Sequence, residues 1–281
     1  MKTVIRNLAA ILLLMILTIS CVSKEKYLVL SAKASQLRKE NSEIRIQKTK
    51  LNKTRYKLKN AVAAKDKFLK SKTYEIKKYL TEMGLECNIK SEELNPLELK
   101  TAYPKRKEIY EKVEIQKNLL DVANKTKWLN KEEKEVYYYL NYARVYPVDF
   151  CNEFIIPLYK KNPEDVYLAT LIMHLNEMKP LNPVTPDRQL FEESLCHAKS
   201  TGEAGITGHD RISSSCSSSF MAESISYGDT DAAGHIVNLL VDSGVESLGH
   251  RYICLGEGYT VCGIAKAPHT VYTENIVLDF R

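Results

Sequence analysis

The chain has 281 residues, of which 44% are hydrophobic, and 41 Lys and Arg against 35 Asp and Glu give it a formal net charge of +6 at pH 7. The charge is uneven, because residues 24–130 hold 27 basic and 14 acidic residues whereas residues 131–281 hold 12 and 21. Beyond the first 20 residues no apolar run approaches the roughly 18 that a spanning helix needs, which excludes a further membrane span.

Residues 1–20 have the layout of a secretory signal. Lys2 and Arg6 give a positive start, residues 8–17 are almost wholly apolar, and a small residue precedes Cys21. A Cys at the cleavage point resembles a bacterial lipoprotein signal, in which that Cys becomes the new N-terminus and carries the lipid. An uncleaved anchor, or an ordinary signal peptide with a chance Cys, is the alternative.

The lipoprotein interpretation sets the expected location and partners. We expect a protein anchored to the membrane through a lipid on Cys21, in the bacterial cell envelope, periplasmic or at the cell surface and on the outer membrane. Nucleic acid is a poor candidate partner for such an exported chain.

Residues 21–83 carry a heptad pattern and contain neither Gly nor Pro. Apolar residues at one heptad position, with charges around them, predict a helical coiled-coil stalk. The a positions are mixed and partly charged, and Asn41 among them is the kind of buried polar residue that favours a dimer in register. The alternative is one long amphipathic helix that folds back on a second helix over 105–122. The d positions are Leu30, Leu37, Ile44, Leu51 and Leu58.

The basic surface of this region could lie along anionic lipid headgroups or acidic polysaccharide, or simply be solvated. Gly84, Pro96 and Pro104 end the heptad pattern, so residues 84–130 are expected to form a linker with a helix. The folded domain is expected over residues 131–281, because about 150 residues are enough for one well-filled core.

The expected elements of this domain are helices first and antiparallel strands last. A helix begins at the N-cap Asn130, with two Glu in its first turn, and stops before Pro147. Asp187 is the expected N-cap of a helix that continues to about residue 201. This order predicts an α+β domain with layers of helix and sheet. The other expected elements are helices over 163–178 and 236–241 and strands over 259–265 and 270–280, joined by a turn at Pro268.

Two histidines and one glutamate stand in recognisable local frames on separated segments. Neutral imidazole is a good ligand for zinc and similar ions, and two His with one carboxylate leave a position open for water or substrate. We therefore predict that His209, Glu223 and His250 converge and bind a divalent metal such as zinc. Simpler interpretations exist: His209 could be a turn residue bonded to backbone, and His250 could orient the glutamate without metal. Glu223 could instead cap a helix or pair with Arg251.

Six cysteines follow Cys21, and none lies in a CxxC pair, which disfavours a zinc-finger site. They allow 15 disulfide pairings that the sequence leaves open. Cys254 and Cys262 flank a Gly-rich turn and either pair across it or are buried. Cys196 beside His197 is not favoured as a nucleophile pair, because adjacent helical residues point about 100° apart. The Ser-rich run over 213–219 is interpreted as a flexible polar loop without a GxSxG frame.

Six motifs of the second half follow one another in a characteristic order. The order resembles the CAP superfamily of cysteine-rich secretory, antigen-five and pathogenesis-related proteins in its bacterial form. That resemblance implies a three-layer α-β-α sandwich in which His209, Glu223 and His250 line a cleft that binds divalent metal in some members. The motifs are Asn141-Tyr142-Ala143-Arg144, Pro183–Leu190 with His197, Gly208-His209, Ala222–Ile225, Ser247–Arg251, and Gly263–Ala265 with the final strand.

The sequence departs from this pattern at three places. The large aromatic residue that usually precedes the Ser-x-Gly-His element is missing, and Gly244 stands near that spot. Ser224 replaces the usual Asn. Eukaryotic members carry a second site Glu near where this chain has Ser247, which bacterial members tend to lack, and Asp242 or Glu246 could supply that carboxylate.

These observations favour a binding module held off the membrane by a stalk. Its ligand would be a divalent metal, a small apolar molecule, or an envelope or host protein, and the stalk could form a homo-oligomer. The second interpretation is a metal-dependent hydrolase, such as a peptidase, that uses the same three residues. No motif indicates a general base or an oxyanion donor for such a hydrolase, so no catalytic residue is assigned. The third interpretation is a mainly structural envelope protein.

Overall fold

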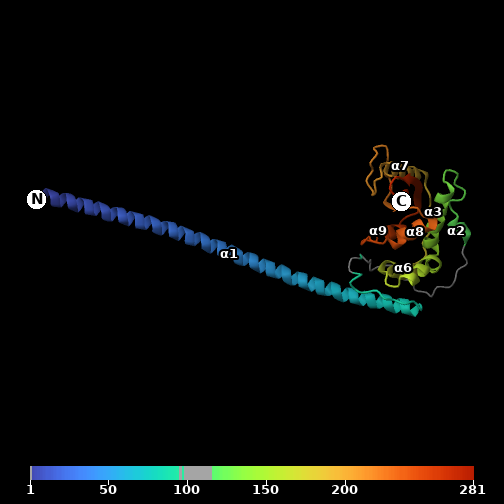
Figure 1. Ribbon diagram of the computed structural model, residues 1–281, viewed down its shortest axis with the longest axis horizontal. Coiled ribbons are helices and arrows are strands. Elements are labelled where there is room, and N and C mark those ends of the chain that lie inside the picture. The colour runs from blue at the N-terminus through green and yellow to red at the C-terminus, as the bar shows by residue number, and fades with distance from the viewer. Residues whose placement is uncertain (1, 95–96, 98–115) are drawn as a thin grey trace. The chain divides into compact units, whose positions relative to one another are not determined.

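The computed structural model describes residues 2–94, 97 and 116–281, with the side chains of residues 24 and 26 onward. The chain divides into two compact units, Met1–Lys67 and Phe68–Arg281. Figure 1 colours their elements along the chain. None of the described helices is both long and apolar enough to span a bilayer. The lipidation prediction at Cys21 concerns a side chain outside this description and stays a prediction.

The first unit is part of one long helix, α1 (Lys2–Glu82), which ends just before Gly84. The prediction of a continuous helix is confirmed, and its physical reason is the absence of Gly and Pro from residues 21–83. The coiled coil itself stays a prediction. Most of the alternative second helix, over 105–122, lies outside the described residues, and the rest contains the short helix α2 (Lys117–Leu120).

The second unit begins with the last turns of α1 and continues to the C-terminus. Ile76 and Leu80 from those turns join Ile89 and Leu94 in the same apolar core as the later helices and strands. After α2, the helices are α3 (Lys131–Val145), α4 (Pro147–Phe150), the π-helix η1 (Cys151–Ile155), α5 (Ile156–Lys161), α6 (Val166–Glu177), α7 (Arg188–Ala204), α8 (Ala232–Val241) and α9 (Gly249–Cys254).

The sheet has four strands in the order β1-β3-β4-β2. Strand β3 (Val261–His269) pairs antiparallel with β4 (Thr273–Phe280), which pairs antiparallel with β2 (Ala222–Tyr227). The two-residue strand β1 (Thr185–Pro186) runs parallel to β3. Helices and a mostly antiparallel sheet confirm the α+β class. The register places Glu223 and Gly263 opposite Asp279 on either side of it.

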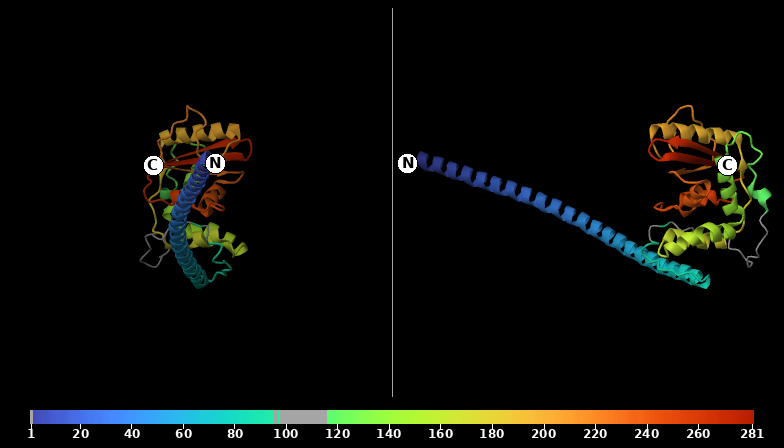
Figure 2. Two further views of the ribbon diagram at one scale, coloured as in Figure 1. Left: turned by 90° about the vertical axis from the view of Figure 1, so that its left-hand side faces the viewer. Right: turned by 45° about the vertical axis from the view of Figure 1, so that its right-hand side comes forward.

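Helix α7 lies along one face of the sheet (Figure 2). The contact is close because Gly263 has no side chain: a Cβ there would lie 2.1 Å from the carbonyl carbon of Leu190. Ser194, one turn further along the helix, donates to the Asp279 carboxylate at 2.8 Å. The sheet and α7 are therefore joined at the two inner strands, β3 and β4.

Both helix starts that the sequence predicts are present. Asn130 and Glu133 form a reciprocal capping box at the start of α3, and Asp187 accepts from the Leu190 amide at the start of α7. Helix α3 ends at Val145, before Pro147, as expected. Local cap chemistry therefore explains these boundaries.

The closing hairpin differs from the prediction. Pro268 lies within β3 rather than in the turn, and the chain reverses over residues 270–272. Pro is tolerated near a strand end, where few ladder bonds depend on its missing N–H. Three elements over 147–161 and strand β2 were also not expected.

Candidate functional site

The segment that carries His209 follows the C-terminus of α7 and is held at Gly208. The Gly208 amide donates to the Tyr227 hydroxyl at 2.9 Å, and its carbonyl lies 3.0 Å from Nε2 of buried His197. Burial lowers the pKa of His197, so the ring is neutral near pH 7 and Nε2–H donates. Gly208 has a φ of 109°, a conformation that favours glycine. Hydrogen bonds therefore hold both the amide and the carbonyl of Gly208, the residue that precedes His209.

The Ser-rich return of this segment is fastened to α7 at two points. Cys196 and Cys216 form a disulfide, which is one of the 15 pairings that the sequence left open. The Glu193 carboxylate accepts from the Ser219 amide at 2.7 Å and from the hydroxyls of Ser219 and Ser217. The interpretation of residues 213–219 as a flexible loop did not foresee these bonds.

Glu223 lies on β2 and connects His209 to Arg211. Its Oε1 is 2.8 Å from His209 Nδ1, and its Oε2 accepts from Arg211 Nη2 at 2.6 Å. The Glu223 side chain is only 2% exposed. Burial acts to raise its pKa, but the hydrogen bonds from His209 and Arg211 outweigh burial and lower that pKa to about 2. The same bond to Glu223 raises the pKa of His209.

Asp279 adds a second buried carboxyl group to this cluster. It accepts from Ser194, and its other oxygen lies 3.8 Å from Arg211 Nη2. Burial and the neighbouring Glu223 carboxylate raise the pKa of Asp279 to about 8. The two carboxyl groups on adjacent strands therefore share one proton near neutral pH.

His250 is held by a carboxylate of its own. Asp242, the C-cap of α8, accepts from the His250 amide at 3.0 Å and lies 2.8 Å from its Nδ1. Of the two carboxylates that the sequence offered for this role, it is Asp242 that contacts the ring. Its side chain is 2% exposed, and its backbone is left-handed with a φ of 58°.

The structure brings the two predicted histidines together. The rings of His209 and His250 have centroids 6.3 Å apart and an angle of 35° between their planes. In each ring Nδ1 faces a buried carboxylate, and no described residue contacts Nε2 through a hydrogen bond. A carboxylate at Nδ1 fixes the tautomer that leaves the Nε2 lone pair available. The site is thus a pair of His–carboxylate units.

This geometry changes the role of Glu223. One of its oxygens contacts His209 and the other accepts from Arg211, so Glu223 orients the His209 ring. Within the described parts of the chain, no group of three or more His, Cys, Asp or Glu side chains is arranged to hold a metal. The Nε2 atoms of His209 and His250 are the ring nitrogens of this cluster that the described hydrogen bonds leave unused. Glu223 as a direct ligand stays a prediction.

The simpler interpretation of Glu223 is wrong on both counts. The residue lies on a strand, not at a helix end, and its partners are His209 and Arg211. Arg251 instead donates to the carbonyls of Leu240 and Val241 within the core. The sequence did not indicate Arg211 as the partner of Glu223, because Arg211 stands in no recognisable motif.

The remaining histidines and cysteines have structural settings. Cys196 is bonded to Cys216, so it offers no thiol to His197. Cys254 and Cys262 are buried free thiols and do not pair with each other. The three other histidines are buried, namely His174, His235 and His269.

Comparisons with known proteins add no family assignment. The chain matches no family model, no curated protein and no solved structure.

Proposed function

We propose that the second unit is a CAP-like α-β-α sandwich whose paired histidines bind a divalent cation such as zinc. The proposal includes a lipid on Cys21 that keeps the protein in the bacterial envelope. The observation that carries it is the pair of His–carboxylate units, His209–Glu223 and His250–Asp242, with ring centroids 6.3 Å apart. Because each Zn–N bond is only about 2.0–2.1 Å, this separation lies at the long end of what two imidazoles on one ion allow.

The carboxylates support binding by the physical chemistry of metal sites. Metal-bound histidines usually donate their other N–H to a carboxylate, which raises the basicity of the ligand and fixes its orientation. Both units here have that form, and both carboxylates are buried. The rings are partly exposed, 58% for His209 and 24% for His250, so an ion can reach them.

Binding is favoured over hydrolysis by the state of Glu223. A bound zinc ion would lower the pKa of a water molecule, but hydrolysis also needs a general base poised near the working pH. The pKa of Glu223 is lowered to about 2, and its oxygens are committed to His209 and Arg211, which makes it a weak base. Turnover of substrate is therefore the outcome that would replace this proposal.

Zinc titration by calorimetry of the full-length chain tests the cation site. We expect His209→Ala and His250→Ala each to weaken binding at least about tenfold, and Glu223→Gln to weaken it about 10- to 100-fold through the orientation of His209. Affinity should fall as the pH drops below 7, because the raised pKa of His209 lets protons compete for its ring.

The matched control is Glu257→Gln, which removes an exposed carboxylate outside both His–carboxylate units and should leave affinity within about twofold. Zinc binding that none of the histidine substitutions changes would refute the site. Hydrolysis of a peptide library that chelator and His250→Ala both abolish would show an enzyme instead.

The anchor is tested separately. In a lipidating bacterial host, we expect the mature chain to begin at Cys21 with a lipid mass added, and to sediment with membranes. Cys21→Ser should release it to the soluble fraction, whereas Ser20→Ala should not. An unmodified soluble wild-type product would remove the anchor from the proposal without affecting the cation site.

A further inference from the structure

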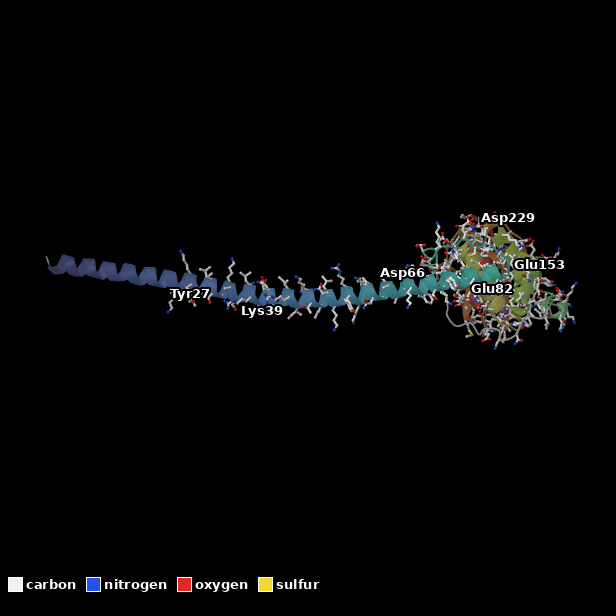
Figure 3. The ribbon with its side chains drawn as sticks, turned by 90° about the horizontal axis from the view of Figure 1, so that it is seen from below. Tyr27, Lys39, Asp66, Glu82, Glu153 and Asp229 are labelled. Atoms are coloured by element: carbon white, nitrogen blue, oxygen red, sulfur yellow. A yellow bond between two sulfur atoms is a disulfide. The ribbon has the colours of Figure 1, made fainter. Side chains whose placement is uncertain are left out.

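Helix α1 presents an uncovered apolar stripe in the first unit. Five residues spaced by seven, each between 50% and 68% exposed, form this heptad stripe: Leu30, Leu37, Ile44, Leu51 and Leu58. Figure 3 shows side chains projecting outwards along the same helix, with Tyr27 and Lys39 labelled. Tyr27 itself is 72% exposed. Across the described residues nothing buries these side chains, so the stripe has the form of an unpartnered binding surface.

The spacing of the heptad stripe favours a helix as the occupant over a flat surface. A strict seven-residue repeat drifts by about 20° per heptad around a straight α-helix. Over the four heptads from Leu30 to Leu58 the stripe therefore turns by about 80°. A planar lipid surface cannot follow that turn, whereas a helix that supercoils around α1 can. Between Leu37 and Leu58, where the a positions are polar, the stripe is also narrower than the apolar face of a helix that lies in a membrane.

The charges at the neighbouring a positions disfavour a second copy of this chain. With the stripe at d, the a positions include Lys48 and Arg55. In a parallel dimer in register, each of these cations would face its own copy across the seam. The flanking g–e pairs do not compensate. Glu40 at g attracts Arg45 at e, but Lys33 at g repels Arg38 at e by a similar amount.

An antiparallel pair of copies meets the same difficulty. Antiparallel helices place e positions opposite e positions, and the charged e residues of the central heptads are Arg38, Arg45 and Lys59. Across residues 24–67 the helix has 14 Lys and Arg against 4 Asp and Glu. Two copies therefore carry the same large net positive charge, which disfavours their association in either orientation.

We propose that the heptad stripe of α1 binds an acidic, heptad-patterned helix of a different protein. The partner would present Leu or Ile to the five stripe residues and Glu to Lys48 and Arg55 and to the basic e positions. Charge complementarity at a, e and g positions is what selects partners in coiled coils. This proposed interaction shares no residue with the cation site, so a test of one does not decide the other.

The test uses the full-length chain in nonionic detergent and a synthetic 35-residue probe. The acidic probe has Leu at its d positions, Glu opposite Lys48 and Arg55, and Glu at e and g; a basic probe carries Lys at every one of those Glu positions. We expect the wild-type chain to bind the acidic probe, with helicity rising on mixing and affinity falling with salt, and to bind the basic probe at least tenfold more weakly.

A matched pair of charge reversals locates the contact. The double variant Lys48→Glu/Arg55→Glu changes two seam positions, whereas Lys50→Glu/Lys53→Glu makes the same change of charge on the outer face. We expect the seam variant to bind the acidic probe at least tenfold more weakly than the wild type does. The outer-face variant should keep an affinity within about threefold of the wild type. Equal losses in both variants would overturn the proposal, since they would show attraction to net charge alone.

Two other results would also overturn it. Sedimentation of the wild-type chain as a dimer at micromolar concentration, with no binding of the acidic probe, would assign the stripe to a second copy. Binding to phosphatidylglycerol vesicles without binding to the probe would assign it to an anionic lipid surface.

Discussion

Replacing Arg144 by Leu should destabilise the second unit by about 3–5 kcal/mol, because it removes a buried cation that holds several backbone carbonyls. Arg144 is 0% exposed on α3. Its guanidinium donates to the carbonyls of Asn182, Cys254, Gly256 and Tyr259, at distances between 2.7 and 3.3 Å. Leu fills part of the space but leaves these carbonyls without donors in a site that excludes water.

Urea unfolding followed by the fluorescence of the single Trp measures this effect, since Trp128 packs on Phe191 within the same unit. The control is Lys131→Leu on the same helix, where the side chain is 90% exposed and the expected change is within about 0.5 kcal/mol. Arg144→Lys retains the charge but lacks the fork of donors. Its loss of stability should therefore lie between those of Arg144→Leu and Lys131→Leu. A midpoint for Arg144→Leu equal to that of Lys131→Leu would contradict the structural role.

The second prediction concerns the proton shared by Asp279 and Glu223. In the unfolded chain Asp279 titrates near 3.9, whereas in the fold its pKa is raised to about 8. Between these values the folded state binds the proton and the unfolded state does not. The free energy of unfolding should therefore decrease as pH rises from about 4 to 8, by up to about 1.4 kcal/mol per pH unit. Asp279→Asn should remove this slope, because an amide stays neutral and can still donate to Glu223.

The same urea experiment at pH 4 to 9 checks the sign. The free energy of unfolding of Asp279→Asn, relative to that of the wild type, should increase as pH rises. This difference in stability should level off above about pH 8. Asp229→Asn, at an exposed position, is the control and should run parallel to the wild type. Glu223 acts in the opposite sense: its lowered pKa contributes stability above about pH 4.5 that is lost as pH falls toward 2. A constant difference between the Asn variant and wild type at all pH values would show that Asp279 is ionised in the fold.

Much of the secondary structure of the second unit was predictable because its causes are local. Asn130 and Asp187 accept hydrogen bonds from amides within three residues, so their sequence context alone indicates a helix start. The last two strands were recognisable from their alternating sequence, although the structure buries runs of consecutive residues in both strands rather than alternate ones. Strand β2 was missed because it is six residues long and its buried residues Glu223, Ser224 and Ser226 are polar.

The sequence by itself determined the long uninterrupted helix and the α+β class, and it pointed to three groups that the structure brings together, His209, Glu223 and His250. Each depends on local pattern: the absence of helix breakers, the period of the apolar residues, and short motifs. Only the tertiary structure decided that each histidine has its own buried carboxylate, that Glu223 also binds Arg211, and that Asp279 keeps a proton. These depend on strand register and on loops that bring residues together across tens of positions, so the energy that selects each partner comes from burial and not from neighbours in the chain.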